Sequence, residues 1–249
     1  MSGRRAKAER RAGRDAPASV IAAMSTADRM RSLDLSAIPL TRYRQFIVGW
    51  LRAAFEQSFA IATLTKAGLG YTAAPNKRSF AEIVIRLQWV HGVAQADRAG
   101  ALDAMIEDEK RNTEKFFKHL EDMGYKSDID LSEMKAFVTE VTDDRHIKDQ
   151  AMKVVEAAKA TEGQSIGMYY SWRHETQYTH ATSALAISYA PDIQNRLGSG
   201  RPEAVDPDLE THRLITMLIV TLVYRLLIED GVDEKLAMTI VDRYFDIDR

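Results

Sequence analysis

The chain has 249 residues, of which 45% are apolar, so it can bury a substantial core and wholesale disorder is excluded. It contains no cysteine, which excludes disulfide bonds, thiolate zinc sites and a cysteine nucleophile. The formal net charge of -2 gives no overall signature of nucleic-acid or membrane binding. Only 6 prolines and 13 glycines interrupt the chain, which favours long helices over a turn-rich β-fold.

The chain begins with a basic segment. It lacks the apolar stretch of a secretion signal, so we expect a solvated tail, with transient contact to nucleic acid or acidic lipid as the alternative. A short helix is predicted over 18–31. We therefore assign 1–35 to the basic tail and short helix, and 36–249 to a single all-helical domain. The charged residues of the tail are Arg4, Arg5, Lys7, Arg10, Arg11 and Arg14, against Glu9 and Asp15.

Two long helices are predicted next. Thr41 is a suitable N-cap for a helix that ends near Gly68, because its side chain can accept a hydrogen bond from the first turn. The glycine-containing segment 68–76 is predicted to be a linker. A second helix, from Lys77 to about Val93, is apolar over most of its circumference, so we expect it at the centre of the fold.

The second half of the chain is also predicted to be helical. We expect one helix capped by Asp97 and ending at Gly124, one or two charged helices within 128–163, and one helix from about 165 to Pro191. A further helix capped by Asp208 contains the apolar run 214–223, which is too short for a membrane span of ~20 residues. A final helix follows Gly231. No strand-like alternation persists, so the predicted fold is an all-α multi-helix bundle with long central helices in a soluble cytoplasmic protein.

The segment from Tyr169 to His180 is the strongest functional candidate. In one continuous helix, Arg173 and His180 lie seven positions apart and project from the same face. A cation beside an imidazole suits work on a phosphodiester, because one group holds the anion and the other moves a proton. The alternative is structural: Arg173 pairs with a carboxylate, and His180 donates to a backbone carbonyl in the core. Tyr170 and Tyr178 could stack on a base or could belong to the core.

A second candidate is the pair Arg78 and Glu82, one turn apart at the start of the apolar helix. An exposed i,i+4 ion pair is the simplest interpretation. Because buried charges must be paired and hydrogen-bonded, an internal polar network is also predicted, one that reaches Tyr170, Ser171 or His180. A binding or catalytic role is the third interpretation.

Metal and cofactor sites are not expected. Paired Glu-x-x-His sequences of di-metal bundles do not occur, and His174-Glu175 followed by His180 is not the His-Glu-x-x-His of zinc proteases. The pair Gly68 and Gly70 lacks the lysine and the preceding strand of a phosphate loop.

Two known families resemble this chain. The segment Arg78-Ser79-Phe80-Ala81-Glu82, continuing to Val90, is similar to a characteristic helix of an uncharacterised, mostly bacterial family, the domain of unknown function (DUF) numbered fifty-six seventy-seven. The segment from Tyr170-Ser171 to His180 and Ser183 resembles the second characteristic helix of that family. This resemblance covers roughly 45–230 and implies a helical fold without implying an activity.

The second resemblance is to HEPN domains (higher eukaryote and prokaryote nucleotide-binding), helical bundles that include metal-independent ribonucleases of toxin–antitoxin and phage-defence systems. Arg173-His174 followed by His180 is similar to their signature of arginine, a polar residue and histidine. It implies that His180 assists attack by the ribose 2′-hydroxyl and that Arg173 stabilises the phosphate. It also implies a homodimer, an antitoxin partner and RNA as substrate. Around this pair we expect six residues in binding or supporting roles: Arg78, Glu82, Tyr170, Ser171, His174 and Tyr178. The competing prediction is a non-catalytic helical protein that binds a partner or small ligand.

Overall fold

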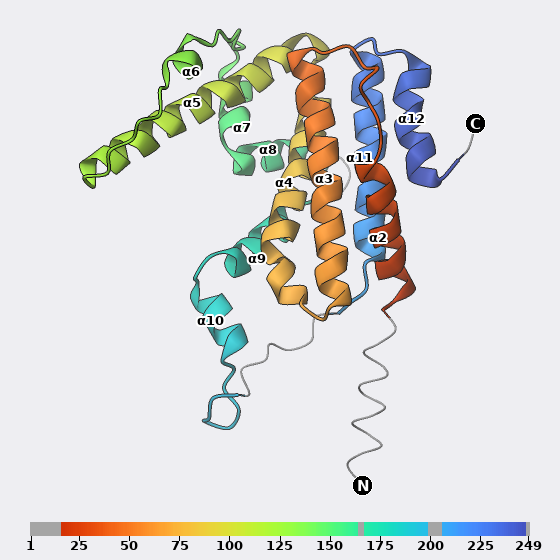
Figure 1. Ribbon diagram of the computed structural model, residues 1–249, viewed down its shortest axis with the longest axis vertical. Helices are drawn as coiled ribbons and strands as arrows, with labels where there is room; N and C mark the ends of the chain where they lie inside the picture. Colours follow the sequence, from red (N-terminus) through yellow and green to blue (C-terminus); the bar gives the residue numbers. More distant parts are fainter. Residues whose placement is uncertain (1–15, 164–166, 199–205, 248–249) are drawn as a thin grey trace.

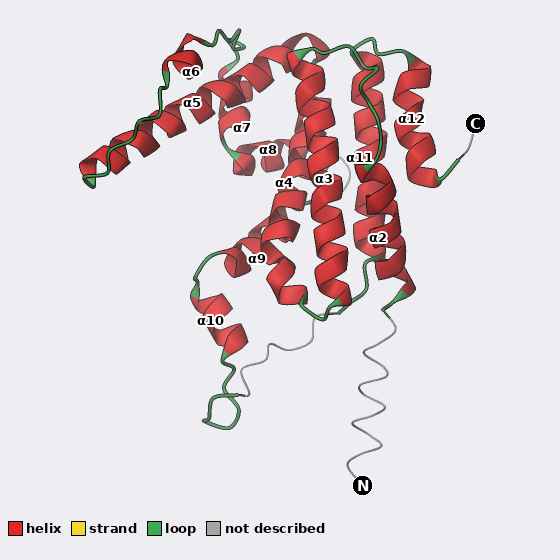
Figure 2. Cartoon of the chain, in the orientation of Figure 1, coloured by secondary structure: helices red, strands yellow, loops and turns green. Residues whose placement is uncertain are grey.

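The computed structural model describes residues 16–163, 167–198 and 206–247. Within these ranges the chain forms eleven α-helices and two short 3-10 helices, and no strand (Figures 1 and 2). One isolated β-bridge joins Asp192 and Leu197. The prediction of an all-α bundle is confirmed. The basic tail 1–15 lies outside the described residues.

Five helices lie side by side and form the bundle (Figure 1). Their inward faces bury large apolar side chains, among them Phe55, Ile85 and Leu227, each at most 1% exposed. Such burial is the main source of stability of a helical bundle, at about 1.5–3 kcal/mol for each large side chain. The five helices are α2 (Ala18–Arg31), α3 (Arg42–Lys66), α4 (Ala74–Gly92), α11 (Glu210–Glu229) and α12 (Glu234–Phe245).

The first helix of the bundle has the predicted bounds, Ala18–Arg31. Its Val20 and Ala27 are fully buried in the same core as α3, and the Arg29 guanidinium donates to the carbonyl of Tyr244 on α12 at 3.0 Å. The short helix is therefore packed between the second and the last helices of the described chain.

The start of α3 also follows the prediction, because Thr41 Oγ1 accepts from the backbone N–H of Arg44 at 3.1 Å. The helix ends at Lys66, and Gly68 takes a positive φ of 74° that its missing Cβ permits. The prediction of a linker over 68–76 is wrong from Gly70 onward. Residues 70–73 form a 3-10 helix, and α4 begins at Ala74 with Pro75 in its first turn, where the missing N–H has no intrahelical partner to lose.

Beyond the bundle, α5 (Arg98–Asp122) projects outward as an arm, and α6 (Ser132–Ala136) lies beside it (Figure 1). The buried residues of α5 all lie within its first two turns, 98–104. Asp97 occupies the predicted N-cap position of α5, but it also ends a 3-10 helix, Gln95–Asp97, and its side chain accepts no capping hydrogen bond. The charged stretch 128–163 holds three short helices, α6, α7 (Arg145–Met152) and α8 (Val154–Thr161), instead of one or two.

The single helix predicted between 165 and Pro191 is wrong. Two helices are present, α9 (Tyr169–Thr179) and α10 (Ser183–Tyr189), separated by three residues. His180 is extended, with φ of -108° and ψ of 162°, and Thr182 caps α10 by accepting from the N–H of Leu185 at 3.2 Å. A threonine cap starts a new helix here and interrupts the old one.

In the described chain, α11 is the helix that is long and apolar enough to cross a membrane, with 20 residues and a mean hydropathy of 1.5 in its most apolar window. The apolar run 214–223 was predicted to be too short for a membrane span, but the helix that contains it is long enough, so its length does not exclude a span. About 44% of that window is buried inside the protein, and Ile219 and Val223 are fully enclosed. A buried core helix satisfies the same length and composition test. The N-cap is Leu209, not the predicted Asp208.

Candidate functional site

A row of four aromatic rings, the aromatic ladder, runs along the exposed face of α9, with three rings from α9 and one from the 3-10 helix before α4. The His174 ring stacks beside Tyr170 with centroids 5.9 Å apart and planes inclined by 22°, and Tyr178 follows at 5.2 Å. Tyr71, from the 3-10 helix Gly70–Ala73, extends the row at 5.8 Å from Tyr178. The residues on α9 are four apart, so a single helix face presents them. Tyr170 is 76% exposed, so this end of the aromatic ladder is open to solvent.

Arg173 lies on the same face, three residues after Tyr170, and its side chain is exposed. His180 is exposed as well, but it follows the last residue of α9 and leaves the helical path. Neither side chain makes a hydrogen bond or an ion pair with any part of the chain that the structure describes. The guanidinium of Arg173 is therefore available to bind a phosphate. His180 lies outside α9, so the helix does not fix its imidazole relative to Arg173.

The opposite face of α9 is held on α4 by a polar contact that spans the two predicted segments. Arg78 Nε donates to Thr176 Oγ1 at 3.2 Å, and its guanidinium lies 5.7 Å from the centre of the Trp172 ring. Trp172 Nε1 donates to Glu82 Oε2 at 3.3 Å. An internal network is thus present, but it reaches Trp172 and Thr176 instead of the predicted Tyr170, Ser171 or His180.

The predicted ion pair between Arg78 and Glu82 is not formed; the two side chains are not among the ion pairs of the described chain. Each partner is engaged by α9 instead, since the indole of Trp172 lies against the guanidinium and bonds the carboxylate. These contacts join residues 90 or more positions apart in the sequence. Arg78 and Glu82 therefore hold α9 in position on the bundle.

One turn after Glu82, α4 carries a buried arginine, Arg86. Arg86 is 6% exposed, and burial lowers its pKa, with the Glu82 charge acting in the opposite direction. Its Nη1 donates to the Gln150 carbonyl on α7 at 2.8 Å, and the side-chain amide oxygen of Gln150 accepts from Trp89 Nε1 at 2.8 Å. These bonds tie α7 to α4, and sequence reasoning missed them.

A small pocket of about 140 Å³ lies behind α9, between α3, α4 and α11. Ser171, one of the predicted residues, lines it together with Lys77 and His212. The His212 Nε2 and the buried Ser58 Oγ share a hydrogen bond of 2.8 Å. Burial and, to a smaller extent, the Lys77 cation lower the pKa of His212 to about 4. The imidazole is therefore neutral at pH 7.

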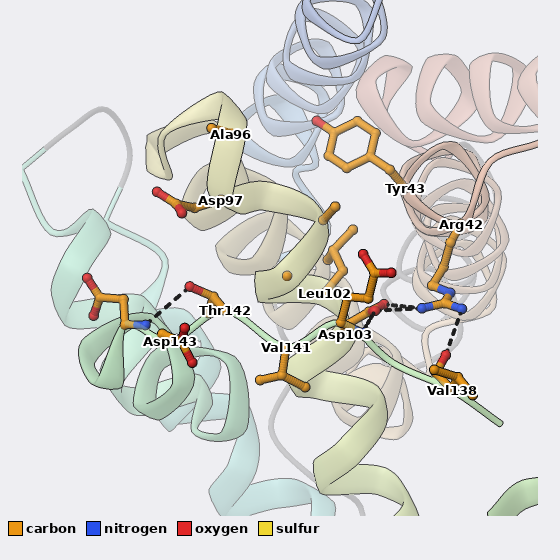
Figure 3. Close-up of a pocket in the computed structure, with 14 residues that line it drawn as sticks. Arg42, Tyr43, Ala96, Asp97, Leu102, Asp103, Val138, Val141, Thr142 and Asp143 are labelled. Atoms are coloured by element: carbon orange, nitrogen blue, oxygen red, sulfur yellow. Dashed lines mark hydrogen bonds and ion pairs between the residues drawn. The ribbon is translucent and has the colours of Figure 1, made fainter. Parts of the chain in front are cut away.

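A larger pocket of about 870 Å³ lies at the root of the α5 arm (Figure 3). Both carboxylate oxygens of Asp103 lie 2.6 Å from Arg42 Nη1, and Oδ2 also accepts from the N–H of Glu140 at 2.6 Å. Arg42 donates to the Val138 carbonyl at 3.1 Å as well. These hydrogen bonds hold the segment 138–144, which we call the strap, against α3 and α5. The polar groups of Arg42 and Asp103 therefore stabilise the fold at this point of the pocket.

The predicted site residues that lie on α9 thus separate into two faces of that helix, whereas Arg78 and Glu82 belong to α4 and His180 follows the end of α9. Tyr170, Arg173, His174 and Tyr178 come together on the exposed face, while Ser171 turns to the pocket behind it. The side chain of Glu175, which lies 3.5 Å from His174 Nδ1, was not predicted.

Three further residues were missed: Trp172, Thr176 and Tyr71. The four-residue spacing of Trp172 and Thr176 is a signal for a shared helix face, but nothing local identifies α4 as the partner.

In the described ranges no group of three or more histidine, aspartate or glutamate side chains could hold a metal ion. Comparison of the chain with family models, curated proteins and solved structures gives no match. The resemblances to the DUF family and to HEPN domains therefore stay predictions.

Proposed function

We propose that the exposed face of α9 binds single-stranded RNA and that the protein is an HEPN-like, metal-independent endoribonuclease. The observation that supports this most strongly is the aromatic ladder of Tyr170, His174, Tyr178 and Tyr71. Each base that stacks on an aromatic side chain contributes about 1–3 kcal/mol to binding, with little dependence on sequence. A row of rings with an open end suits an unpaired strand better than a duplex, whose bases are already stacked.

Arg173 supplies the charge that a nucleic-acid site needs. It lies beside Tyr170 and His174 on the exposed face and has no carboxylate partner among the described residues. A guanidinium can hold two phosphate oxygens at once, so Arg173 would anchor the backbone while the rings take the bases.

His180 would carry out the proton transfer. In the proposed step the ribose 2′-oxygen attacks the adjacent phosphorus, and His180 takes the 2′-hydroxyl proton as general base. The bond from phosphorus to the 5′-oxygen breaks, the leaving oxygen takes a proton from water, and the products carry a 2′,3′-cyclic phosphate and a 5′-hydroxyl. Arg173 would stabilise the additional negative charge on the phosphate.

The resemblance to HEPN domains also suggests where the enzyme acts, in which oligomeric state and in which biological role. The enzyme would act in the cytoplasm as a homodimer, in stress or phage defence, with an antitoxin as its inhibitor. A second copy could also fix the position of His180, which the end of α9 leaves free.

Cleavage of end-labelled single-stranded RNA in EDTA tests the catalytic claim. We expect cleavage by the wild-type protein, and loss of cleavage without loss of binding in His180→Ala. The Arg173→Ala variant should lose both. The matched controls are His119→Ala on the α5 arm and Arg145→Ala at the start of α7, both exposed, which should behave as wild type. Equal cleavage by wild type and His180→Ala would refute the assignment.

One observation favours a non-catalytic alternative. Since α9 ends at Thr179, Arg173 and His180 do not belong to the same helix, and the contacts of Arg78 and Glu82 hold α9 in place. A protein of this kind would bind through the aromatic ladder without cleaving. In the same assay such a protein would leave the end-labelled RNA intact. On a native gel it would shift the mobility of that RNA if RNA is its ligand.

A further inference from the structure

The pocket behind α9 has apolar walls and a size that suits a small organic molecule. Its volume is about 140 Å³, and Ile61, Phe80, Met168 and Ile215 contribute to its lining. An apolar cavity of about 150 Å³ is large enough to hold a benzene-sized molecule. The pocket therefore accepts an aliphatic group of a few carbons and excludes a nucleotide.

Two opposite charges reach this pocket from different helices. Lys77 comes from α4 and Glu175 from α9, and both line the cavity. They do not pair with each other, and Lys77 makes no hydrogen bond or ion pair anywhere in the described chain. The Glu175 side chain is only 17% exposed, and its carboxylate lies 3.5 Å from His174 Nδ1. No lysine or arginine of the described chain pairs with it. A largely buried carboxylate gains stability from a full positive charge beside it.

The remaining polar groups in the pocket add no charge. His212 is neutral at pH 7 because its pKa is lowered to about 4, and one of its nitrogens is engaged by Ser58. Ser171 contributes a hydroxyl, which can donate or accept. The lining therefore carries one cation, one anion and an apolar wall, so its net charge is zero.

We propose that this pocket binds a free α-amino acid with a small aliphatic side chain, such as valine. The carboxylate would pair with Lys77, the ammonium group with Glu175, and the side chain would lie against Phe80 and Ile215. A zwitterion satisfies both charges at once, whereas a simple carboxylic acid leaves Glu175 without its partner and a simple amine leaves Lys77 without one. The inference does not rest on RNA binding.

Calorimetric titration of the full-length protein with L-valine tests the proposal. We expect saturable binding, and at least tenfold weaker binding of 3-methylbutanoate, which lacks the ammonium group, and of 2-methylpropan-1-amine, which lacks the carboxylate. The variants Lys77→Met and Glu175→Gln should each weaken L-valine binding at least tenfold. Lys118→Met, an exposed lysine on the α5 arm, is the control and should bind as wild type.

Two results would overturn the proposal. One is the absence of binding heat for L-valine, L-leucine and L-isoleucine at concentrations up to about 10 mM, above the range of a specific small-molecule site. The other is equal binding of L-valine by wild type and by both variants, each shown to be folded by circular dichroism. Because no RNA is present, failure of this titration and failure of the RNA assay are separate results.

Discussion

The burial of His212 predicts that one histidine makes the protein sensitive to acid. The pKa of His212 is lowered from 6.5 to about 4, first by burial and then by the Lys77 cation. In the unfolded chain the imidazole would take up a proton near its ordinary pKa, while in the folded chain it would not. The stability that depends on neutral His212 is therefore complete above pH 6.5 and is lost as the pH falls from 6.5 towards 4.

The size of the effect follows from the two pKa values. Linkage gives a loss of about 2 kcal/mol at pH 5 and at most about 3 kcal/mol at pH 4, relative to pH 7.5. Carboxylates elsewhere also respond to acid, so the informative quantity is the difference between two proteins. In His212→Gln the side-chain amide can still bond Ser58 Oγ and never takes up a proton.

Urea unfolding followed by circular dichroism at pH 7.5, 6.5, 5.5 and 5.0 measures this difference. The wild type should lose about 2 kcal/mol more than His212→Gln between pH 7.5 and 5.0. His119→Gln, an exposed histidine on α5, is the control and should follow the wild type. If the curves of wild type and His212→Gln stay parallel over the whole range, the burial of a neutral imidazole is refuted.

Three further substitutions test the packing. A Cβ at Gly100 would lie 2.7 Å from the backbone nitrogen of Thr142, so Gly100→Ala should displace the strap and lower the free energy of unfolding by about 1–3 kcal/mol in urea titrations. Gly49, in the middle of α3, has no atom within 4 Å of such a Cβ, so Gly49→Ala should raise it by about 0.5–1 kcal/mol in the same assay. Arg42→Ala should cost about 1–3 kcal/mol, because Asp103 is 4% exposed and would lose its cation; a change under 0.5 kcal/mol would contradict that role.

The helices follow from local signals, whereas the site depends on contacts that no local pattern encodes. The Thr41 cap sets the start of α3 within one turn, and periodicity suffices for the long helices. The break at His180 was missed because the pattern of apolar residues continues across it, and only the cap at Thr182 starts a new helix. The contact between Arg78 and Thr176 spans 98 positions, and the addition of Tyr71 to the aromatic ladder depends on how the segment after α3 packs.

The central claim is that an unpaired RNA strand lies on the exposed face of α9. Photo-crosslinking of the full-length protein to single-stranded RNA that contains 4-thiouridine, followed by mass spectrometry of the peptides, tests it most directly. The account predicts crosslinks at Tyr170, His174 and Tyr178, and a reduced yield in Tyr170→Ala but not in Tyr125→Ala, an exposed tyrosine after the α5 arm. Crosslinks confined to the basic tail 1–15 or to α5, with an unchanged yield in Tyr170→Ala, would contradict it.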